Sequence, residues 1–179
     1  MSETSDLPHA TRFSGRVWTF GDHISTDVMM PGSKVLARPN ITPEEAASHC
    51  MSANRPGWSA QVRKGDIIVA GRNFGCGSSR PAPRLLRTLG ISVAVADSMA
   101  RVFFRNCIHV GFPALLCPGV SKVFEEGQVA EVDMETGAVM NLTTGQRLQA
   151  EPLEPGTPPY DILQAGGLDQ YLLHVLRKR

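Results

Sequence analysis

A short glycine-rich segment carries the side chains best suited to chemistry, and it reads Gly-Arg-Asn-Phe-Gly-Cys-Gly-Ser-Ser-Arg over residues 71–80. Two hydroxyl groups, those of Ser78 and Ser79, stand directly before the guanidinium of Arg80. The glycines permit backbone conformations that other residues avoid, so a ligand can approach the main chain closely. We expect a helix to begin at the serines, where unpaired N–H groups and the helix dipole attract carboxylate or phosphate. A planar guanidinium also suits a carboxylate, so the segment predicts an anion site.

Three interpretations of this segment compete. A dinucleotide-binding fingerprint needs a third glycine at position 80, where arginine stands. A phosphate-binding loop needs Gly-Lys followed by Ser or Thr, and the chain has no such sequence. In the plainest interpretation, the segment is a glycine-rich turn whose serines only cap the next helix. The residues alone leave the anion site and the plain turn equally open.

The elements that must position this segment follow from apolar patterning. Continuous apolar runs predict buried strands at 17–20, 66–70, 91–96 and 114–117. Capping residues and glycine stops predict helices at 42–51, 84–89, 97–108 (capped by Asp97 and Ser98) and 160–176, the last interrupted near Gly166. Alternating residues separated by glycine turns predict an antiparallel meander over 129–150. This order predicts one mixed α/β domain over residues 13–179 with a parallel central part, after a flexible lead-in over residues 1–12.

Composition limits the classes of function. The chain has 179 residues, 42% of them apolar, and a net charge of +1, so nothing indicates a nucleic-acid or membrane surface. No apolar run approaches the roughly 18–20 residues of a membrane span, and residues 1–12 lack the apolar core of a secretion signal. The four cysteines have no Cys-x-x-Cys spacing, which predicts free thiols in a reducing cytoplasm and no metal bound by this chain.

Several motifs together resemble one family. Gly-Cys-Gly-Ser-Ser-Arg, after a strand reading Asp-Ile-Ile-Val-Ala, resembles the active-site loop of the aconitase swivel domain, and Asn-Phe-Gly-Cys-Gly is similar to the form in isopropylmalate dehydratase small subunits. Three further segments resemble the family in the expected order, at 22–31, 42–51 and 97–106. The resemblance spans roughly residues 17–165, and an ordered set of motifs is much more specific than one alone.

The resemblance implies a swivelling β/β/α domain and a reversible dehydration–rehydration of a hydroxy-diacid or triacid. It implies a 4Fe–4S cluster on a larger partner subunit, so that this chain is inactive alone. Carried over by position, Ser78 is the base that removes a proton alpha to a carboxylate, and Arg80 grips a substrate carboxylate. The other residues expected around the substrate are Ser79, Gly77, Cys76, Thr26 and Lys34. The first-choice reaction is the interconversion of 2-isopropylmalate and 3-isopropylmalate in leucine biosynthesis.

Two departures from the family pattern keep alternatives open. Pro81-Ala82-Pro83 stands where the family usually has Glu followed by His or Gln, so two polar side chains are lost beside the proposed base. In the loop at 33–38, Lys34 or Arg38 can meet an extra carboxylate, as a homoaconitate-like substrate requires, or both are solvated charges. The alternatives are therefore another C2-branched malate, a non-catalytic anion-binding module of the same fold, or a stand-alone thiol enzyme that uses Cys76.

Overall fold

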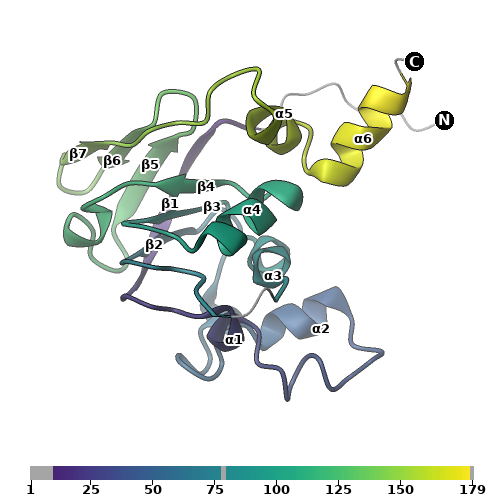
Figure 1. Cartoon of the computed structure of the whole chain (residues 1–179). Coiled ribbons are helices and arrows are strands. Elements are labelled where there is room, and N and C mark those ends of the chain that lie inside the picture. Colours follow the sequence, from purple (N-terminus) through teal and green to yellow (C-terminus); the bar gives the residue numbers. More distant parts are fainter. Residues whose placement is uncertain (1–9, 78–79, 178–179) are drawn as a thin grey trace.

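The computed structural model describes residues 10–77 and 80–177, and a seven-stranded sheet forms its centre (Figure 1). The first four strands are parallel, and the last three extend the sheet beyond β1 in antiparallel order. The spatial order is β4-β3-β2-β1-β5-β6-β7. The strands are β1 (Arg12–Phe20), β2 (Ile67–Ala70), β3 (Val93–Ala96), β4 (Ala114–Leu116), β5 (Val129–Asp133), β6 (Ala138–Asn141) and β7 (Arg147–Gln149).

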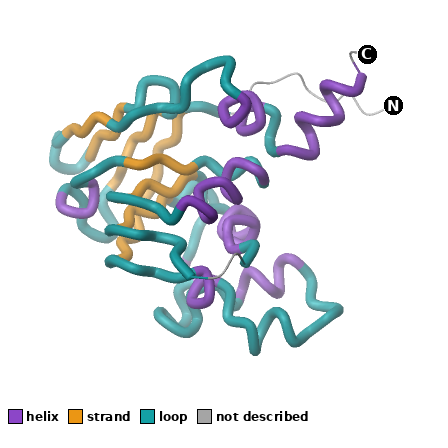
Figure 2. Tube along the Cα trace, in the orientation of Figure 1, coloured by secondary structure: helices purple, strands orange, loops and turns teal. Residues whose placement is uncertain are grey.

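Helices cover the parallel half of the sheet, and Figure 2 shows them gathered beside its strands. Apolar residues of α1 to α4 pack in the same core as one face of these strands, whereas α5 contributes Leu163 to the core of the opposite face. The helices are α1 (Thr26–Met29), α2 (Pro43–Ser48), α3 (Ala82–Leu89), α4 (Arg101–His109), α5 (Pro158–Gln164) and α6 (Leu168–Arg177). Two short 3-10 turns are η1 (Ser59–Gln61) and η2 (Val120–Lys122).

The central strands are buried on both faces because their side chains alternate between two cores. In β2, Ile68 and Ala70 pack toward α1 to α4, while Ile67 and Val69 pack in the second core with residues of β5 and β6. The sheet therefore curls so that its parallel and antiparallel halves enclose one core. This alternation explains why the sequence of β2 is continuously apolar.

The predicted α/β fold with a parallel centre and a meander is confirmed. Strand β1 begins at Arg12, five residues earlier than predicted, because its first half pairs with β5. Residues 1–9 of the predicted lead-in lie outside the described residues. The final helix is interrupted as expected, and forms α5 and α6 around Gly166.

Two local predictions were wrong, and one helix was not predicted. The helix after the glycine-rich loop begins at Ala82 with Pro81 at its N-cap, so it starts later than the serines. Asp97 and Ser98 do not cap α4, whose N-cap is Ala100, because both side chains bind other segments. The short helix α1 was not predicted, and it depends on Ser25 Oγ accepting a hydrogen bond from the N–H of Val28.

Candidate active site

Two loops leave the carboxyl ends of β1 and β2 side by side. Partners in these strands differ by 50 in residue number, and the same offset continues beyond the strand ends. The N–H of Arg72 donates to Asp22 Oδ1 at 2.7 Å, and the N–H of Thr26 donates to the carbonyl of Cys76 at 2.8 Å. Because the pairing of β1 with β2 continues in the same register beyond the strands, α1 lies beside the glycine-rich loop.

Close packing holds the first half of the glycine-rich loop. The rings of Phe74 and Phe103 meet edge to face with centroids 5.4 Å apart, and the N–H of Phe74 donates to the carbonyl of Ser98 at 3.0 Å. Gly75 has a φ of +77°, and a Cβ there would lie 2.0 Å from Phe103 Cγ. Only glycine fits this position, because the left-handed backbone and the neighbouring ring both exclude a side chain.

Arg80 is anchored by two contacts from the segment around α1. Its Nε lies 2.9 Å from Asp27 Oδ1, and its Nη1 donates to the carbonyl of Met30 at 2.7 Å. The guanidinium also lies over Gly32, where a Cβ would be 3.2 Å from both terminal nitrogens. About a quarter of the Arg80 side chain (26%) is exposed, so its charge is held in a fixed place and still reaches solvent.

The structure brings several of the predicted site residues together. Thr26 is buried against the backbone of Cys76, and Cys76 is half-buried. A Cβ on Gly77 would lie 3.9 Å from Asp27 Oδ2, so this glycine is next to the partner of Arg80. Lys34 is exposed, and its Nζ lies 3.5 Å from Ser52 Oγ. Ser78 and Ser79 lie outside the described residues, and their roles stay predictions, as do direct substrate contacts of the others.

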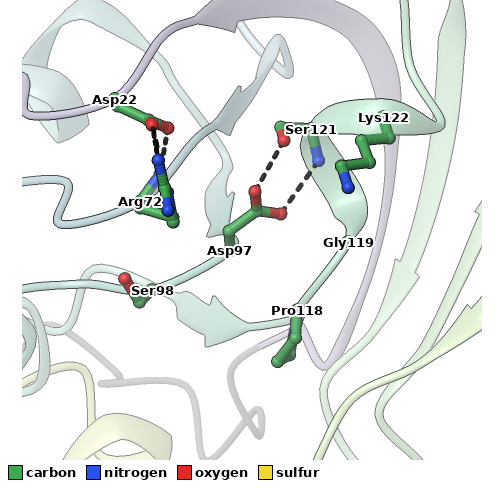
Figure 3. A pocket seen from close by; sticks show the side chains of 8 residues that line it. All are labelled: Asp22, Arg72, Asp97, Ser98, Pro118, Gly119, Ser121 and Lys122. Carbon is green, nitrogen blue, oxygen red and sulfur yellow. Dashed lines mark hydrogen bonds and ion pairs between the residues drawn. The ribbon is translucent and has the colours of Figure 1, made fainter.

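A polar pocket of about 530 Å³ opens at the carboxyl ends of the parallel strands (Figure 3). Arg72 Nη2 donates to Asp22 Oδ2 at 2.8 Å on one side, and Asp97 accepts from the N–H and hydroxyl of Ser121 on the other. The Arg72 contacts lower the pKa of Asp22, with the backbone hydrogen bond as the largest cause. The residues that line the pocket are Asp22, Arg72, Asp97, Ser98, Pro118, Gly119, Ser121 and Lys122.

Sequence reasoning missed the pairing in this pocket. Arg72 and Asp97 each follow a buried strand directly, and parallel strands end at the same edge of a sheet, where ligands of open α/β sheets bind. The position of Arg72 and Asp97 just after buried strands was the sequence signal that could have placed both residues at this edge. From the sequence, Asp97 was predicted only as a helix cap. Its hydrogen bonds with Ser121 could not be predicted without knowing that β4 lies beside β3.

The cysteines do not form a thiolate cluster in the part of the chain that the structure describes. Burial raises the pKa of Cys50 to about 12 and that of Cys117 to about 11, and it also raises the pKa of Cys107. Within residues 10–77 and 80–177, no group of three His, Cys, Asp or Glu side chains is placed to hold a metal ion. In the same residues, no helix is long and apolar enough to cross a bilayer.

Comparisons with known proteins define the class first. The family model of the aconitase C-terminal domain matches residues 40–117, which include the glycine-rich loop and the helices beside it. The fold and the loop are thus those of an aconitase-type swivel domain.

Individual relatives narrow the class. The chain is 48% identical to 3-isopropylmalate dehydratase small subunit 1 of Methanopyrus kandleri, over 86% of this chain and 88% of that protein. It is 42% identical to the methanogen homoaconitase small subunit of Methanothermobacter thermautotrophicus, over 90% and 91% of the two chains. The crystal structure of 3-isopropylmalate dehydratase from Methanocaldococcus jannaschii superposes with a TM-score of 0.84 at 34% identity, covering 94% of this chain and 99% of that one. The chain belongs to the family of 3-isopropylmalate dehydratase small subunits, within the aconitase superfamily.

Proposed function

We propose that this chain is the small subunit of a heteromeric hydro-lyase that interconverts 2-isopropylmalate and 3-isopropylmalate by dehydration and rehydration. The observation that carries the proposal is the anchored, partly exposed guanidinium of Arg80, at the end of a Gly-x-Gly-Ser-Ser-Arg loop in a family of dehydratase small subunits. The partner is a large subunit, and its 4Fe–4S cluster would supply the Lewis acid that binds the substrate hydroxyl. The complex works in the cytoplasm, in leucine biosynthesis.

The role of Arg80 is to bind and orient one substrate carboxylate. A guanidinium offers a planar set of N–H donors that matches the two oxygens of a carboxylate, and such charge-assisted bonds are stronger than neutral ones. Its two anchors fix the plane of the group before the substrate arrives, which reduces the entropy lost on binding.

The role of Ser78 is to take the proton from the carbon alpha to a carboxylate and to return a proton in the reverse direction. A serine hydroxyl is a weak base in water, so its alkoxide needs stabilisation by hydrogen-bond donors and a nearby cation. Arg80, two residues further on, supplies that cation. The later start of α3, at Ala82, reduces the contribution that the helix dipole makes in this scheme.

A second candidate substrate is a homoaconitate-like triacid, which the similarity to a homoaconitase small subunit favours. This substrate carries an extra carboxylate, and Lys34 or Arg38 would have to meet it. Arg38 is paired with Glu45 at an exposed surface, whereas within residues 10–77 and 80–177 the contact of Lys34 is a long one with Ser52. Isopropylmalate stays the first-choice substrate. If the substrate is a triacid, Lys34 is the residue that we expect to bind the extra carboxylate.

The test is to mix the purified chain with its anaerobically reconstituted large partner and to assay a panel of malates branched at C2. We expect reversible interconversion of the isopropylmalates only when both subunits are present, with lower kcat/KM for methylmalate and homoaconitate. Turnover by this chain alone, abolished by thiol alkylation, would instead support an enzyme that uses Cys76. Anion binding without turnover of any member of the panel would support a non-catalytic module.

A further inference from the structure

We propose that Asp27 is a positioning residue, which holds the Arg80 guanidinium in the orientation that receives the substrate carboxylate. This inference rests on the function proposed above for Arg80. Its basis is the contact between Asp27 Oδ1 and Arg80 Nε at 2.9 Å, together with the bond from Arg80 Nη1 to the carbonyl of Met30 at 2.7 Å. Two anchors on different nitrogen atoms determine both the direction and the plane of the guanidinium.

The anchors leave one edge of the guanidinium for a ligand. The group has five N–H donors; Asp27 pairs with it at Nε, and the carbonyl of Met30 accepts from Nη1. Among the residues that the structure describes, no acceptor is bonded to Nη2. In this proposal, the donors on Nη2, together with the second N–H of Nη1, bind the carboxylate oxygens of a substrate. Gly32 lies against these nitrogens and adds no side chain there.

Asp27 orients Arg80 more than it neutralises its charge. Half of the Asp27 side chain (50%) is exposed, so water screens the attraction that a buried carboxylate would exert on the cation. The short contact between Asp27 Oδ1 and Nε still fixes which side of the guanidinium the carboxylate occupies, and screening does not change this placement. A substrate carboxylate therefore meets a cation that keeps most of its electrostatic attraction.

The backbone that carries Asp27 is itself fixed to the loop. Helix α1 is tied at its start, because the N–H of Thr26 donates to the carbonyl of Cys76 at 2.8 Å. At its end, the N–H of Met30 donates back to the carbonyl of Thr26 at 2.9 Å, and Met29 is fully buried. The segment that carries Asp27 is thus tied to the glycine-rich loop at Cys76, four residues before Arg80.

The test compares Asp27→Asn with wild type in the assembled complex. We expect KM for the isopropylmalates to rise about five- to tenfold while kcat changes less than about threefold, because a carboxamide binds Nε more weakly and the ground state and transition state lose the same interaction. Asp27→Glu should recover part of the loss. Glu126→Gln, which removes the carboxylate of another Arg pair of similar exposure, should leave KM unchanged.

A double-mutant cycle separates positioning from a general structural effect. In an Arg80→Ala background, Asp27→Asn should have no further effect on KM. The same rise in KM with and without Arg80, an unchanged KM, or a lower KM caused by removing a competitor of the substrate would each overturn the proposal.

A second readout does not depend on turnover, so it keeps this proposal distinct from the proposed reaction. Malonate, a simple dicarboxylate, is titrated into the isolated chain while the Nε–H signal of Arg80 is followed by NMR. We expect the midpoint of the shift to lie about five- to tenfold higher in Asp27→Asn than in wild type. Equal midpoints would refute positioning by Asp27, whereas an inactive complex with the expected shift in midpoint would refute only the reaction.

Discussion

Two Asp–Arg pairs lie at opposite ends of the parallel pairing between β1 and β2, and their surroundings differ sharply. Arg16 and Asp66 stand where the pairing begins, and Asp66 has only 5% of its side chain exposed. Asp27 and Arg80 stand beyond the carboxyl ends of the strands, and half of Asp27 is exposed. The two cations are similarly exposed, so the contrast lies in the carboxylates: that of Asp66 is enclosed by protein, and that of Asp27 faces solvent at the loop that carries the predicted chemistry.

Three residues donate hydrogen bonds to the carboxylate of Asp66. Its carboxylate accepts from Arg16 Nη2 at 2.6 Å, from Trp18 Nε1 at 2.7 Å and from the N–H of Arg63 at 2.9 Å. Burial alone would raise the pKa of Asp66, but these bonds outweigh it and the pKa is lowered. A carboxylate satisfied in this way stabilises the fold, because the buried N–H of the Trp18 ring would otherwise be left without a partner.

The difference between the pairs indicates that the pairing of β1 with β2 has two roles, stabilising the sheet at one end and positioning the candidate site at the other. At the amino end, a cation and an anion satisfy each other and buried neighbours, which fixes the sheet. At the carboxyl end, the described residues contact the guanidinium of Arg80 at two of its nitrogens, and we propose that its other donors serve a substrate. The predictions below test whether stability and activity separate between these two ends.

The largest effect is expected from Ser78→Ala in the assembled enzyme. Removal of a positioned base lowers kcat by ~10²–10⁴-fold, while substrate still binds because Arg80 is intact. Steady-state kinetics and thermal unfolding of the variant complex check both parts. Ser14→Ala, at an exposed serine in β1, is the matched control. Near-normal turnover of Ser78→Ala would remove Ser78 from the catalytic role.

At the amino end, Asp66→Ala should cost about 1–3 kcal/mol of unfolding free energy, because the buried Trp18 N–H loses its partner, while Arg16 keeps its bond to the carbonyl of Gln61. The milder Asp66→Asn should retain enough fold for kinetics, with KM near the wild-type value. Urea unfolding measures the loss. Glu126→Gln, in a more exposed pair with Arg55, should cost less than about 1 kcal/mol.

The lowered pKa of Asp66 gives this stability a pH dependence of known sign. The contribution is fully present above the unfolded-state pKa of about 3.9 and is lost as pH falls through the lower folded-state pKa. The unfolding free energy of wild type should therefore fall more steeply below about pH 4 than that of Asp66→Asn. Parallel curves for the two proteins would show that Asp66 has no special part in acid stability.

At the carboxyl end, Arg80→Lys should raise KM about 10- to 100-fold with little change in stability. A lysine cannot bond Asp27 and Met30 through separate nitrogens and still present a planar fork, and a charged hydrogen bond contributes about 1.5–3 kcal/mol. Arg84→Lys, on the exposed side of α3, is the control. A wild-type KM in Arg80→Lys would show that the site needs only a positive charge.

Much of the fold was predictable because it follows from local patterning. The continuous apolar run of β2 and the alternation in β5 both express burial, which sequence records directly. Gly90 ends α3 with a φ of +97°, as a helix stop by glycine predicts. Helix α1 escaped prediction because it has four residues and depends on packing against the glycine-rich loop.

The site was predictable only as a set of residue types. One motif identified Arg80, but its partner Asp27 lies 53 positions earlier, and no local pattern joins them. The same holds for Asp22 with Arg72, which the β1–β2 register brings together. Pairing between parallel strands is set by tertiary packing. The sequence can therefore indicate which residues belong to such a site, but not which of them contact one another.

The smallest effects are expected from the cations of the loop at 33–38. Arg38 pairs with Glu45 and Lys34 lies near Ser52, all at exposed positions where such contacts contribute about 0–1 kcal/mol. Lys34→Ala and Arg38→Ala should therefore change kcat/KM for each branched malate by less than about fivefold. A larger loss for Lys34→Ala, confined to homoaconitate and absent with isopropylmalate, would assign Lys34 to a third carboxylate. In that case the loop at 33–38 would be part of the substrate-binding site, together with the loops beyond the carboxyl ends of β1 and β2.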